Sequence, residues 1–263
     1  MTILYSLYAS EGIVFAADRM ITQLTPKGRL YVDSSLPKVT RIARLGAHDE
    51  GGVIGFFGLA ELDGKHTTKW IRELAQEHAN SGGSLRVASF ARRLLAALAK
   101  PATIRSEWLN EVLGFHIGGF EQFGRYKLPV FWFVRNCELT PEGLYIARGG
   151  WRADEQLLGR DLKEVKSGDV RDVLLQIQTN SAIPHWYRNG DLPAFTAITD
   201  ALKAAVSFTA RLQHYGPPEG LDAWCDLGTS FVYTSRNLAR LMYKRGQVSI
   251  GGKADVERLQ WPA

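Results

Sequence analysis

The residues of this chain that could do chemistry lie close to its start. Thr2 carries a hydroxyl group, Asp18 a carboxylate and Lys38 an ammonium group. We expect Met1 to be removed because the next residue is small, which would place a hydroxyl and a free α-amine together on Thr2. Such a residue is a nucleophile with its own base, since an α-amine with a pKa of about 7.7–8.0 accepts a proton near neutral pH.

Short strands must position these groups. β-branched and aromatic residues fill segments 2–9 and 13–17, and Ser10-Glu11-Gly12 has the composition of a turn, so the chain begins with a predicted β-hairpin. A strand is predicted from Lys38 to residue 42. The apolar run at 53–57, which Gly58 ends, predicts a strand buried on both faces.

Helix and strand patterns follow one another along the rest of the chain. Apolar residues at a period of 3.6 predict helices over 59–79, from an N-cap at Ser84 to Pro101, from Asp169 and from Pro193. Further strands are predicted at 29–32, 112–120, 128–135, 143–147, 231–233 and 238–243.

This order of elements predicts the architecture. Two apolar sheets, each needing cover on its outer face, favour an α+β fold arranged as a four-layer α-β-β-α sandwich. No repeat or low-complexity linker divides the chain, so we expect a single domain over residues 1–263 with a loose tail from about residue 251.

Composition narrows the possible functions. The apolar runs are too short to span a membrane and no signal peptide is evident, so we expect a soluble, cytoplasmic protein without membrane contact. The net charge of +5 comes from scattered basic residues, which argues against a nucleic-acid partner. Cys137 and Cys225 lie far apart and the six histidines lack metal-ligand spacing, so neither a disulfide, a metal site nor a cofactor is predicted.

Several of these segments together resemble a known family. Thr2, the turn at Gly12, the run Ala16-Ala17-Asp18, the segment from Pro37 through residue 42 and Gly58 are similar to the proteasome β-subunit family, including bacterial peptidase subunits without a propeptide. The spacing between Thr2 and Asp18 is the one that this family uses. The motif match covers residues 2–63, and beyond them only the order of elements agrees.

The resemblance implies a role for each matched residue. Thr2 matches the nucleophile, and Asp18 matches the carboxylate that holds the charges of the site in place. Lys38 matches the lysine beside the threonine, whose positive charge lowers the pKa of the hydroxyl or amine. Gly58 matches the glycine whose backbone N–H points at the developing oxyanion.

The later part of the site matches the family less closely. Asp226 and Thr229 keep the spacing of the late acidic and hydroxyl residues, although about forty extra residues precede them. An equally good interpretation is that Asp226 caps a turn after Cys225. The family's serine near the end of the middle strands falls on Arg148-Gly149-Gly150, where no hydroxyl is present.

Three functions agree with the sequence. The first is a threonine-type peptidase that hydrolyses protein or peptide substrates inside a homo-oligomeric stacked ring, for which an ATP-dependent unfoldase is a candidate partner. The second is a non-catalytic ring or scaffold subunit, favoured by the absent serine. The third is an amidase of the same nucleophile class that acts on a small amide. The ring and the unfoldase are implied by the resemblance alone.

Overall fold

The computed structural model describes most of the chain. The described residues are 3–25, 28–43, 51–82, 86–100, 103–104, 110–140, 145–157, 160–161, 185–189, 219–242 and 252–261, with single positions at 172, 175, 200, 201, 204, 205 and 208. They form a mixed α and β fold whose paired strands all run antiparallel. The expected mixture of helices and sheets is therefore confirmed.

The hairpin at the start of the chain forms the centre of a four-stranded sheet. Its strands are β1 (Leu4–Ala9) and β2 (Gly12–Asp18), and the sheet order is β13-β1-β2-β14, with β13 (His185–Asn189) and β14 (Ala254–Gln260) at the edges. Gly12 is required between β1 and β2 because a Cβ atom there would lie only 2.1 Å from the carbonyl oxygen of Leu259.

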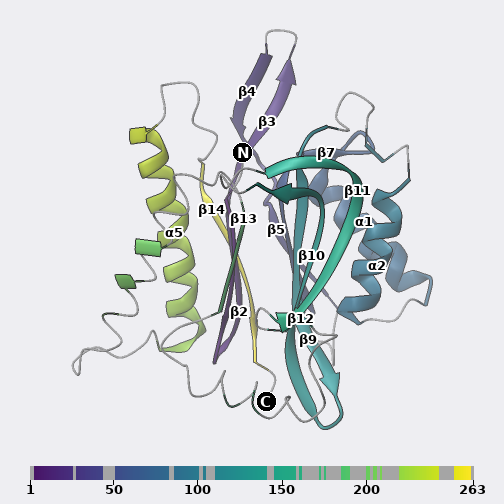
Figure 1. Ribbon diagram of the computed structural model, residues 1–263, viewed down its shortest axis with the longest axis vertical. Helices are drawn as coiled ribbons and strands as arrows, with labels where there is room; N and C mark the ends of the chain where they lie inside the picture. Colours follow the sequence, from purple (N-terminus) through teal and green to yellow (C-terminus); the bar gives the residue numbers. More distant parts are fainter. Residues whose placement is uncertain are drawn as a thin grey trace.

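A six-stranded sheet faces the first one. Its order is β12-β11-β10-β9-β6-β5, built from β5 (Val39–Ile42), β6 (Gly52–Gly58), β9 (Leu113–Phe123), β10 (Tyr126–Leu139), β11 (Tyr145–Leu157) and β12 (Arg160–Asp161). Two short hairpins connect these elements, β3 (Met20–Thr25) with β4 (Gly28–Asp33) and β7 (Glu61–Leu62) with β8 (Lys65–His66). The β3–β4 hairpin projects beyond both sheets (Figure 1).

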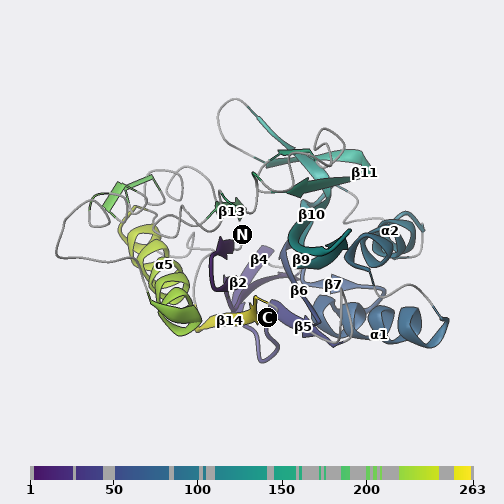
Figure 2. The same cartoon turned by 90° about the horizontal axis from the view of Figure 1, so that it is seen from below.

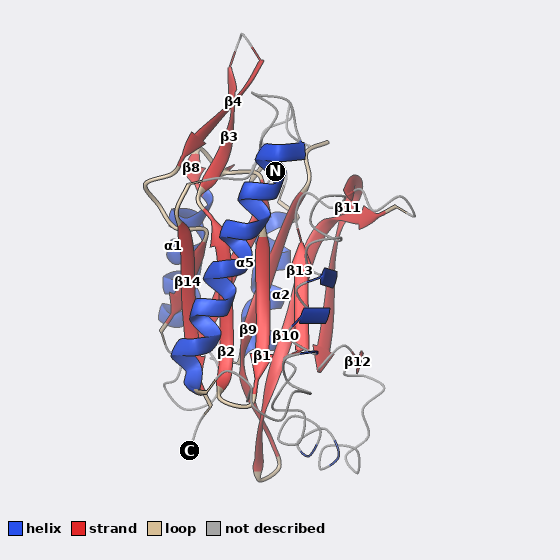
Figure 3. Cartoon of the chain, turned by 90° about the vertical axis from the view of Figure 1, so that its left-hand side faces the viewer, coloured by secondary structure: helices blue, strands red, loops and turns tan. Residues whose placement is uncertain are grey.

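Helices cover the outer faces of the two sheets. α1 (Thr67–Asn80) and α2 (Val87–Leu98) pack on the six-stranded sheet, while α5 (Gly220–Met242) lies across β1, β2 and β14 of the four-stranded sheet. Figure 1 shows α5 on one side and α1 with α2 on the other, Figure 2 shows the same separation from below, and Figure 3 shows α5 lying over the strands. No described helix combines the length and the apolar character that crossing a membrane requires.

Apolar side chains fill the spaces between these elements. Between the sheets, Leu4 and Phe15 of the four-stranded sheet meet Phe57 and Phe131 of the six-stranded sheet. A second cluster lies between the six-stranded sheet and the helices α1 and α2, and a third between the four-stranded sheet and α5. Burial of this surface, at roughly 25 cal/mol per Å², is the main term holding the sheets and helices together.

A chain of hydrogen bonds crosses the apolar space between the sheets. The Tyr145 hydroxyl donates to Asn189 Oδ1, the Asn189 amide contacts His116 Nε2, and His116 Nδ1 lies 2.8 Å from Ser6 Oγ. An amide NH₂ can only donate, so Nε2 accepts and the His116 proton lies on Nδ1, which donates to Ser6. Burial and, to a smaller extent, the charge of Arg135 lower the pKa of His116 to about 3, so the ring is neutral.

The region predicted as two late strands is helical. Residues 231–233 and 238–242 belong to α5, so the strands predicted there are wrong. The buried residues Trp224, Phe231, Val232 and Ala239 recur at helical spacing and pack on the four-stranded sheet. Short apolar groups of two or three residues resemble strands when taken separately, whereas the period of the whole segment is that of a helix.

Two boundary predictions are also wrong. The tail expected to be loose from about residue 251 contains β14, and α2 has Arg86 rather than Ser84 as its N-cap residue. The start of α2 is instead capped from outside the helix, because the buried Glu121 carboxylate accepts the Ala88 N–H at 3.1 Å. The helices predicted from Asp169 and Pro193 lie mostly outside the described residues, so the complete four-layer sandwich stays a prediction.

Candidate active site

A carboxylate and an ammonium group are buried together at one end of the four-stranded sheet. Asp18 ends β2, Lys38 directly precedes β5, and Lys38 Nζ lies 3.2 Å from Asp18 Oδ1. The Lys38 side chain is 1% exposed and that of Asp18 0% exposed. Buried charges are costly unless they are paired and hydrogen-bonded, so each of these groups depends on the other.

The same carboxylate binds the backbone next to Thr2. Asp18 Oδ1 accepts the Ile3 N–H at 2.9 Å, and the Asp18 N–H donates to the Ile3 carbonyl at 3.3 Å. Thr2 itself lies outside the described residues. The Ile3 nitrogen nevertheless belongs to the peptide group that joins Thr2 to Ile3, so the ion pair is one hydrogen bond away from that peptide group.

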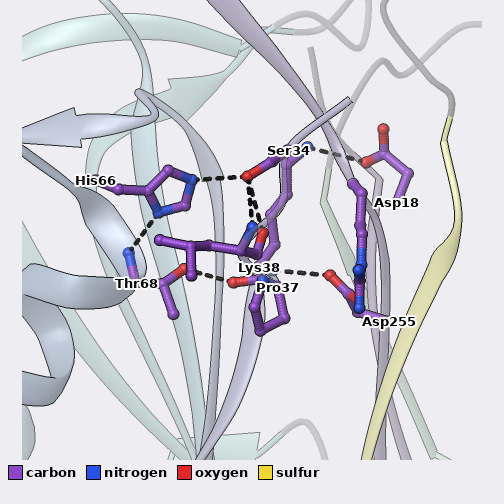
Figure 4. A network of polar contacts seen from close by, with 9 residues as sticks. Asp18, Ser34, Pro37, Lys38, His66, Thr68 and Asp255 are labelled. Atoms are coloured by element: carbon purple, nitrogen blue, oxygen red, sulfur yellow. Dashed lines mark hydrogen bonds and ion pairs between the residues drawn. The ribbon is translucent and has the colours of Figure 1, made fainter. Parts of the chain in front are cut away.

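Lys38 is held at both its backbone and its ammonium group. Its N–H donates to Asp255 Oδ2 at 2.9 Å, and its carbonyl accepts the Phe56 N–H at 3.3 Å. The ammonium donates to the Met20 carbonyl as well as to Asp18. Figure 4 shows Lys38 between Asp18 and Asp255. Lys38 therefore connects the edge of one sheet to the last residue of β2 in the other.

A serine and a histidine fix the turn that leads to Lys38. Ser34 Oγ donates to the Leu36 carbonyl at 2.9 Å, accepts the Leu36 N–H at 3.1 Å and lies 3.0 Å from His66 Nε2. His66 Nδ1 accepts the Thr68 N–H at 3.2 Å, so the proton of the neutral ring lies on Nε2 and is donated to Ser34. Burial and the charge of Lys38 lower the pKa of His66, which favours that neutral form (Figure 4).

Gly58 is required by close packing at the end of β6. Its φ angle is +95°, and a Cβ atom there would lie 1.8 Å from the Val112 carbonyl oxygen. Phe56, whose N–H bonds to Lys38, lies two residues earlier on the same strand. At about 3.4 Å per strand residue, Gly58 is displaced roughly 7 Å along β6 from the position opposite Lys38.

Asp226 and Thr229 lie on α5, which packs on the outer face of the four-stranded sheet. Trp224 Nε1 donates to the Glu11 carboxylate at 2.7 Å, which places this part of the helix beside the start of β2. Asp18 is at the opposite end of that strand. The Asp226 side chain is exposed and that of Thr229 is partly buried. Thr229 follows Gly228, which faces Ala16, two residues before Asp18 on β2.

The sequence did not point to three residues of the network around Lys38. Asp255 falls in the segment expected to be loose, where the apolar residues Val256 and Leu259 lie on opposite faces and give no strand pattern. Ser34 lies in a polar turn, and His66 was expected to be an ordinary packed or solvated histidine. A local signal for Ser34 was present, because a serine hydroxyl in a turn often accepts a hydrogen bond from the backbone N–H two residues further along the chain.

This arrangement holds a positive charge close to the Ile3 N–H in a place that excludes water. An ammonium group nearby lowers the pKa of an amine, because a second positive charge is disfavoured, and lowers that of a hydroxyl, because the anion is favoured. Within the described residues, no group of His, Cys, Asp and Glu side chains could hold a metal ion. The chemistry that such a pair supports is electrostatic activation of an amine or a hydroxyl group placed beside the Lys38 ammonium.

Comparison with known proteins found similarity only among solved structures. No family model matches the chain, and no curated protein matches it. Solved structures to which it is similar include Anbu (ancestral beta-subunit) from Yersinia bercovieri, with 11% identity and a TM-score of 0.48 over 98% of this chain and 81% of that one. A mutant of Anbu from Hyphomicrobium sp. strain MC1 has 12% identity and a TM-score of 0.46, over 98% of this chain and 82% of that one.

These findings correct the resemblance drawn from the sequence. Assignment to the proteasome β-subunit family, in its bacterial form without a propeptide, is wrong: no model of any family matches, and the two similar structures named above are Anbu proteins. The roles suggested for individual residues must therefore stand on the geometry of this chain.

Proposed function

We propose that this chain is a threonine-type N-terminal-nucleophile hydrolase, which cleaves peptide bonds with Thr2 when Thr2 is the first residue. The observation that carries the proposal is Asp18 Oδ1, which binds the Ile3 N–H at 2.9 Å and the Lys38 ammonium at 3.2 Å. A buried ion pair stabilises a fold no better than apolar residues of similar volume. Its hydrogen bond to the peptide group that follows Thr2 therefore favours a chemical role.

In the proposed reaction, Thr2 Oγ1 attacks the carbonyl carbon of a peptide bond while its proton passes to the Thr2 α-amine. The carbonyl electrons move to oxygen and return as the C–N bond breaks, and the leaving amine takes the proton from the Thr2 ammonium. Water then attacks the resulting ester and releases the carboxylic acid with the Thr2 hydroxyl restored. The balance is one peptide bond hydrolysed by one water molecule.

The buried pair supports the first step of this reaction. The Lys38 charge lowers the pKa of the Thr2 α-amine, so that more of the amine is neutral and able to accept a proton near pH 7. Asp18 compensates that charge and orients the ammonium through its Oδ1. Burial strengthens both effects, because the dielectric constant is lower inside the protein and electrostatic interactions are stronger there.

Gly58 is our proposed donor to the oxyanion that forms during the attack. Its backbone lies at the end of β6, beyond the position opposite Lys38, and cannot carry a side chain without contacting Val112. A backbone N–H aimed at such an oxyanion accounts for about 10²–10³ in rate in other enzymes. Asp226 and Thr229 have no part in this proposal.

We extend the proposal to architecture and assembly. The order of α5, two facing sheets and then α1 with α2 supports a four-layer α-β-β-α sandwich (Figure 1). We propose that the chain forms a homo-oligomer. The stacked ring, the unfoldase partner and the cytoplasmic location remain predictions from the sequence. Native mass spectrometry of the purified chain tests the assembly, and a monomer would exclude it.

Intact-mass spectrometry with an electrophile tests the activity. Wild-type protein and Thr2→Ala are incubated with a peptide epoxyketone or boronate. Thr2→Ala is a matched control because alanine is also small enough for Met1 removal but has no hydroxyl. We expect the wild-type chain to lack the mass of one methionine residue and to gain one adduct that Thr2→Ala does not form.

The other outcomes identify the remaining alternatives. Retention of Met1 together with no adduct would exclude the hydrolase and leave a non-catalytic subunit. An adduct at Thr2 combined with cleavage of small amides, but of no peptide longer than a few residues, would favour the small-amide hydrolase. Cleavage of peptides that Thr2→Ala leaves intact is the result that the proposal requires.

A further inference from the structure

Asp255 is a buried carboxylate at the edge of the four-stranded sheet. It lies at the start of β14, directly opposite Ala17 of β2, and is 4% exposed. Residues directly opposite each other in an antiparallel pair share one face of the sheet. Ala17 packs in the apolar cluster between the two sheets, so Asp255 faces the six-stranded sheet rather than α5.

Both oxygens of this carboxylate have a partner near the ion pair. Oδ2 accepts the Lys38 N–H at 2.9 Å, and Oδ1 binds Nε of Arg19, the residue that follows Asp18. Burial raises the pKa of Asp255, and the hydrogen bonds from Arg19 and Lys38 oppose that rise. One side chain thus connects the segments that carry Asp18 and Lys38.

The bond to Lys38 crosses from one sheet to the other. β14 is an edge strand of the four-stranded sheet and β5 an edge strand of the six-stranded sheet, and the two strands contact each other. Lys38 directly precedes β5, yet its ammonium must reach Asp18 in the opposite sheet. The position of the ammonium therefore depends on where the Lys38 backbone is held, and Asp255 holds it.

We propose that Asp255 is a positioning residue of the site, which fixes the Lys38 backbone so that the ammonium stays on Asp18 and beside residue 2. The proposal rests on the proposed function for its catalytic consequence. Its structural part, that Asp255 keeps Lys38 on Asp18, does not depend on activity.

The first measurement follows the Lys38 ammonium directly. Folded protein is treated with formaldehyde and a borane reductant, and methylation of each lysine is measured by peptide mapping. Lys65 is an internal standard for a reactive lysine because its side chain is 43% exposed. We expect Lys38 to be protected in the wild-type chain and in Asp222→Asn, a matched change at a side chain that is 86% exposed. In Asp255→Asn one amide oxygen replaces two carboxylate oxygens, and the charged Arg19 is the stronger donor to it, which turns the NH₂ group toward the Lys38 N–H. We therefore expect Lys38 to react at a rate approaching that of Lys65.

The second measurement asks whether the effect passes through Lys38. The rate of Thr2 labelling by the electrophile is compared among wild type, Asp255→Asn, Lys38→Met and the double variant. We expect Asp255→Asn to slow labelling roughly 10–10²-fold, the size that a displacement of about 1 Å produces. In the Lys38→Met background, Asp255→Asn should have no further effect. A residue needed only for folding would reduce the rate equally in both backgrounds.

The two measurements separate the possible failures. If Lys38 is as well protected from methylation in Asp255→Asn as in the wild type, the positioning role is wrong, whatever the rate of Thr2 labelling. If Lys38 becomes reactive in Asp255→Asn but Thr2 of the wild type is not labelled, the positioning role is supported and the proposed function is excluded. If Asp255→Asn does not fold, Asp255→Glu makes the same test, because it keeps the charge but moves the acceptor by one methylene group.

Discussion

Replacing Lys38 with methionine should destabilise the chain strongly. Lys38→Met keeps most of the length of the side chain but leaves the Asp18 carboxylate buried, with the Ile3 N–H as a remaining donor. Removing one partner of a buried ion pair costs about 3–5 kcal/mol, because the other charge loses its compensation. Since the free energy of unfolding of most domains is about 5–15 kcal/mol, this is a large fraction of it.

A double variant separates the charge from the volume of the side chain. In Asp18→Asn combined with Lys38→Met, no uncompensated charge remains, and the asparagine oxygen can still accept the Ile3 N–H. We therefore expect the double variant to be more stable than Lys38→Met alone, although it carries one more substitution. Additive losses would mean that the two groups are not coupled.

Urea unfolding followed by tryptophan fluorescence and far-ultraviolet circular dichroism measures these effects. Protein concentration is kept constant, because self-association would make the apparent stability depend on it. Lys65→Met is the matched control. The Lys65–Glu73 pair is shorter than the Lys38–Asp18 pair, 2.6 Å against 3.2 Å, but its side chains are 43% and 39% exposed. Water and salt screen such a pair, so we expect only a small change.

Two results of the comparison between Lys38→Met and Lys65→Met would contradict the role of burial. If Lys38→Met and Lys65→Met lost equal stability, the distance between the charges and not their burial would govern these pairs. A wild-type urea midpoint for Lys38→Met would show that the Asp18 charge is compensated in some other way, and the buried pair would then give no support to a chemical role.

Three further predictions concern other parts of the network and the core. Burial lowers the pKa of His116 to about 3, whereas the unfolded chain has the ordinary value of about 6.5. Between these two values the unfolded chain binds a proton that the folded chain does not bind. The free energy of unfolding should therefore decrease as the pH is lowered from 6.5, by up to about 1.4 kcal/mol per pH unit. Urea midpoints between pH 7 and 4 should fall less steeply in His116→Gln, and parallel curves would contradict this. Gly58→Ala should lower the melting temperature more than Gly64→Ala, because both glycines have positive φ angles but only Gly58 lacks space for a Cβ atom. Ser34→Ala should cost about 1–3 kcal/mol by leaving buried polar groups without partners, whereas Ser35→Ala, at an exposed position, should be nearly neutral in the same urea assay.

The parts of the fold that the sequence predicted well are those with local signals. The hairpin of β1 and β2 has turn residues between two apolar runs, and β6, β9 and β10 are apolar enough to be recognised individually. α5 was missed because Phe231-Val232-Tyr233 looks like a strand when it is considered without Trp224 and Ala239. β3 was missed because its side chains are a mixture of polar and apolar residues.

The candidate site was predictable only in part for a related reason. Asp18 and Lys38 stand at the borders of strands that were themselves predicted, so their side chains were expected at a sheet end. Asp255 and His66 reach the site from segments whose partners are distant in the sequence. Pairing between distant segments depends on how the sheets are placed against each other, and no local pattern of residue types encodes that placement.

The position of β14 has a consequence for when the site can form during synthesis. The hydrogen bond between Lys38 and Asp255 joins residues 217 positions apart. At the usual speed of translation, about 5–20 residues per second, Lys38 is made roughly 10–40 s before Asp255. A growing chain can form the first hairpin on the ribosome, but the hydrogen bond to the Lys38 backbone cannot form until β14 has been made. A chain released early would therefore carry Asp18 and Lys38 without the bond that fixes the lysine, and under the proposed function incomplete copies should react slowly with an electrophile.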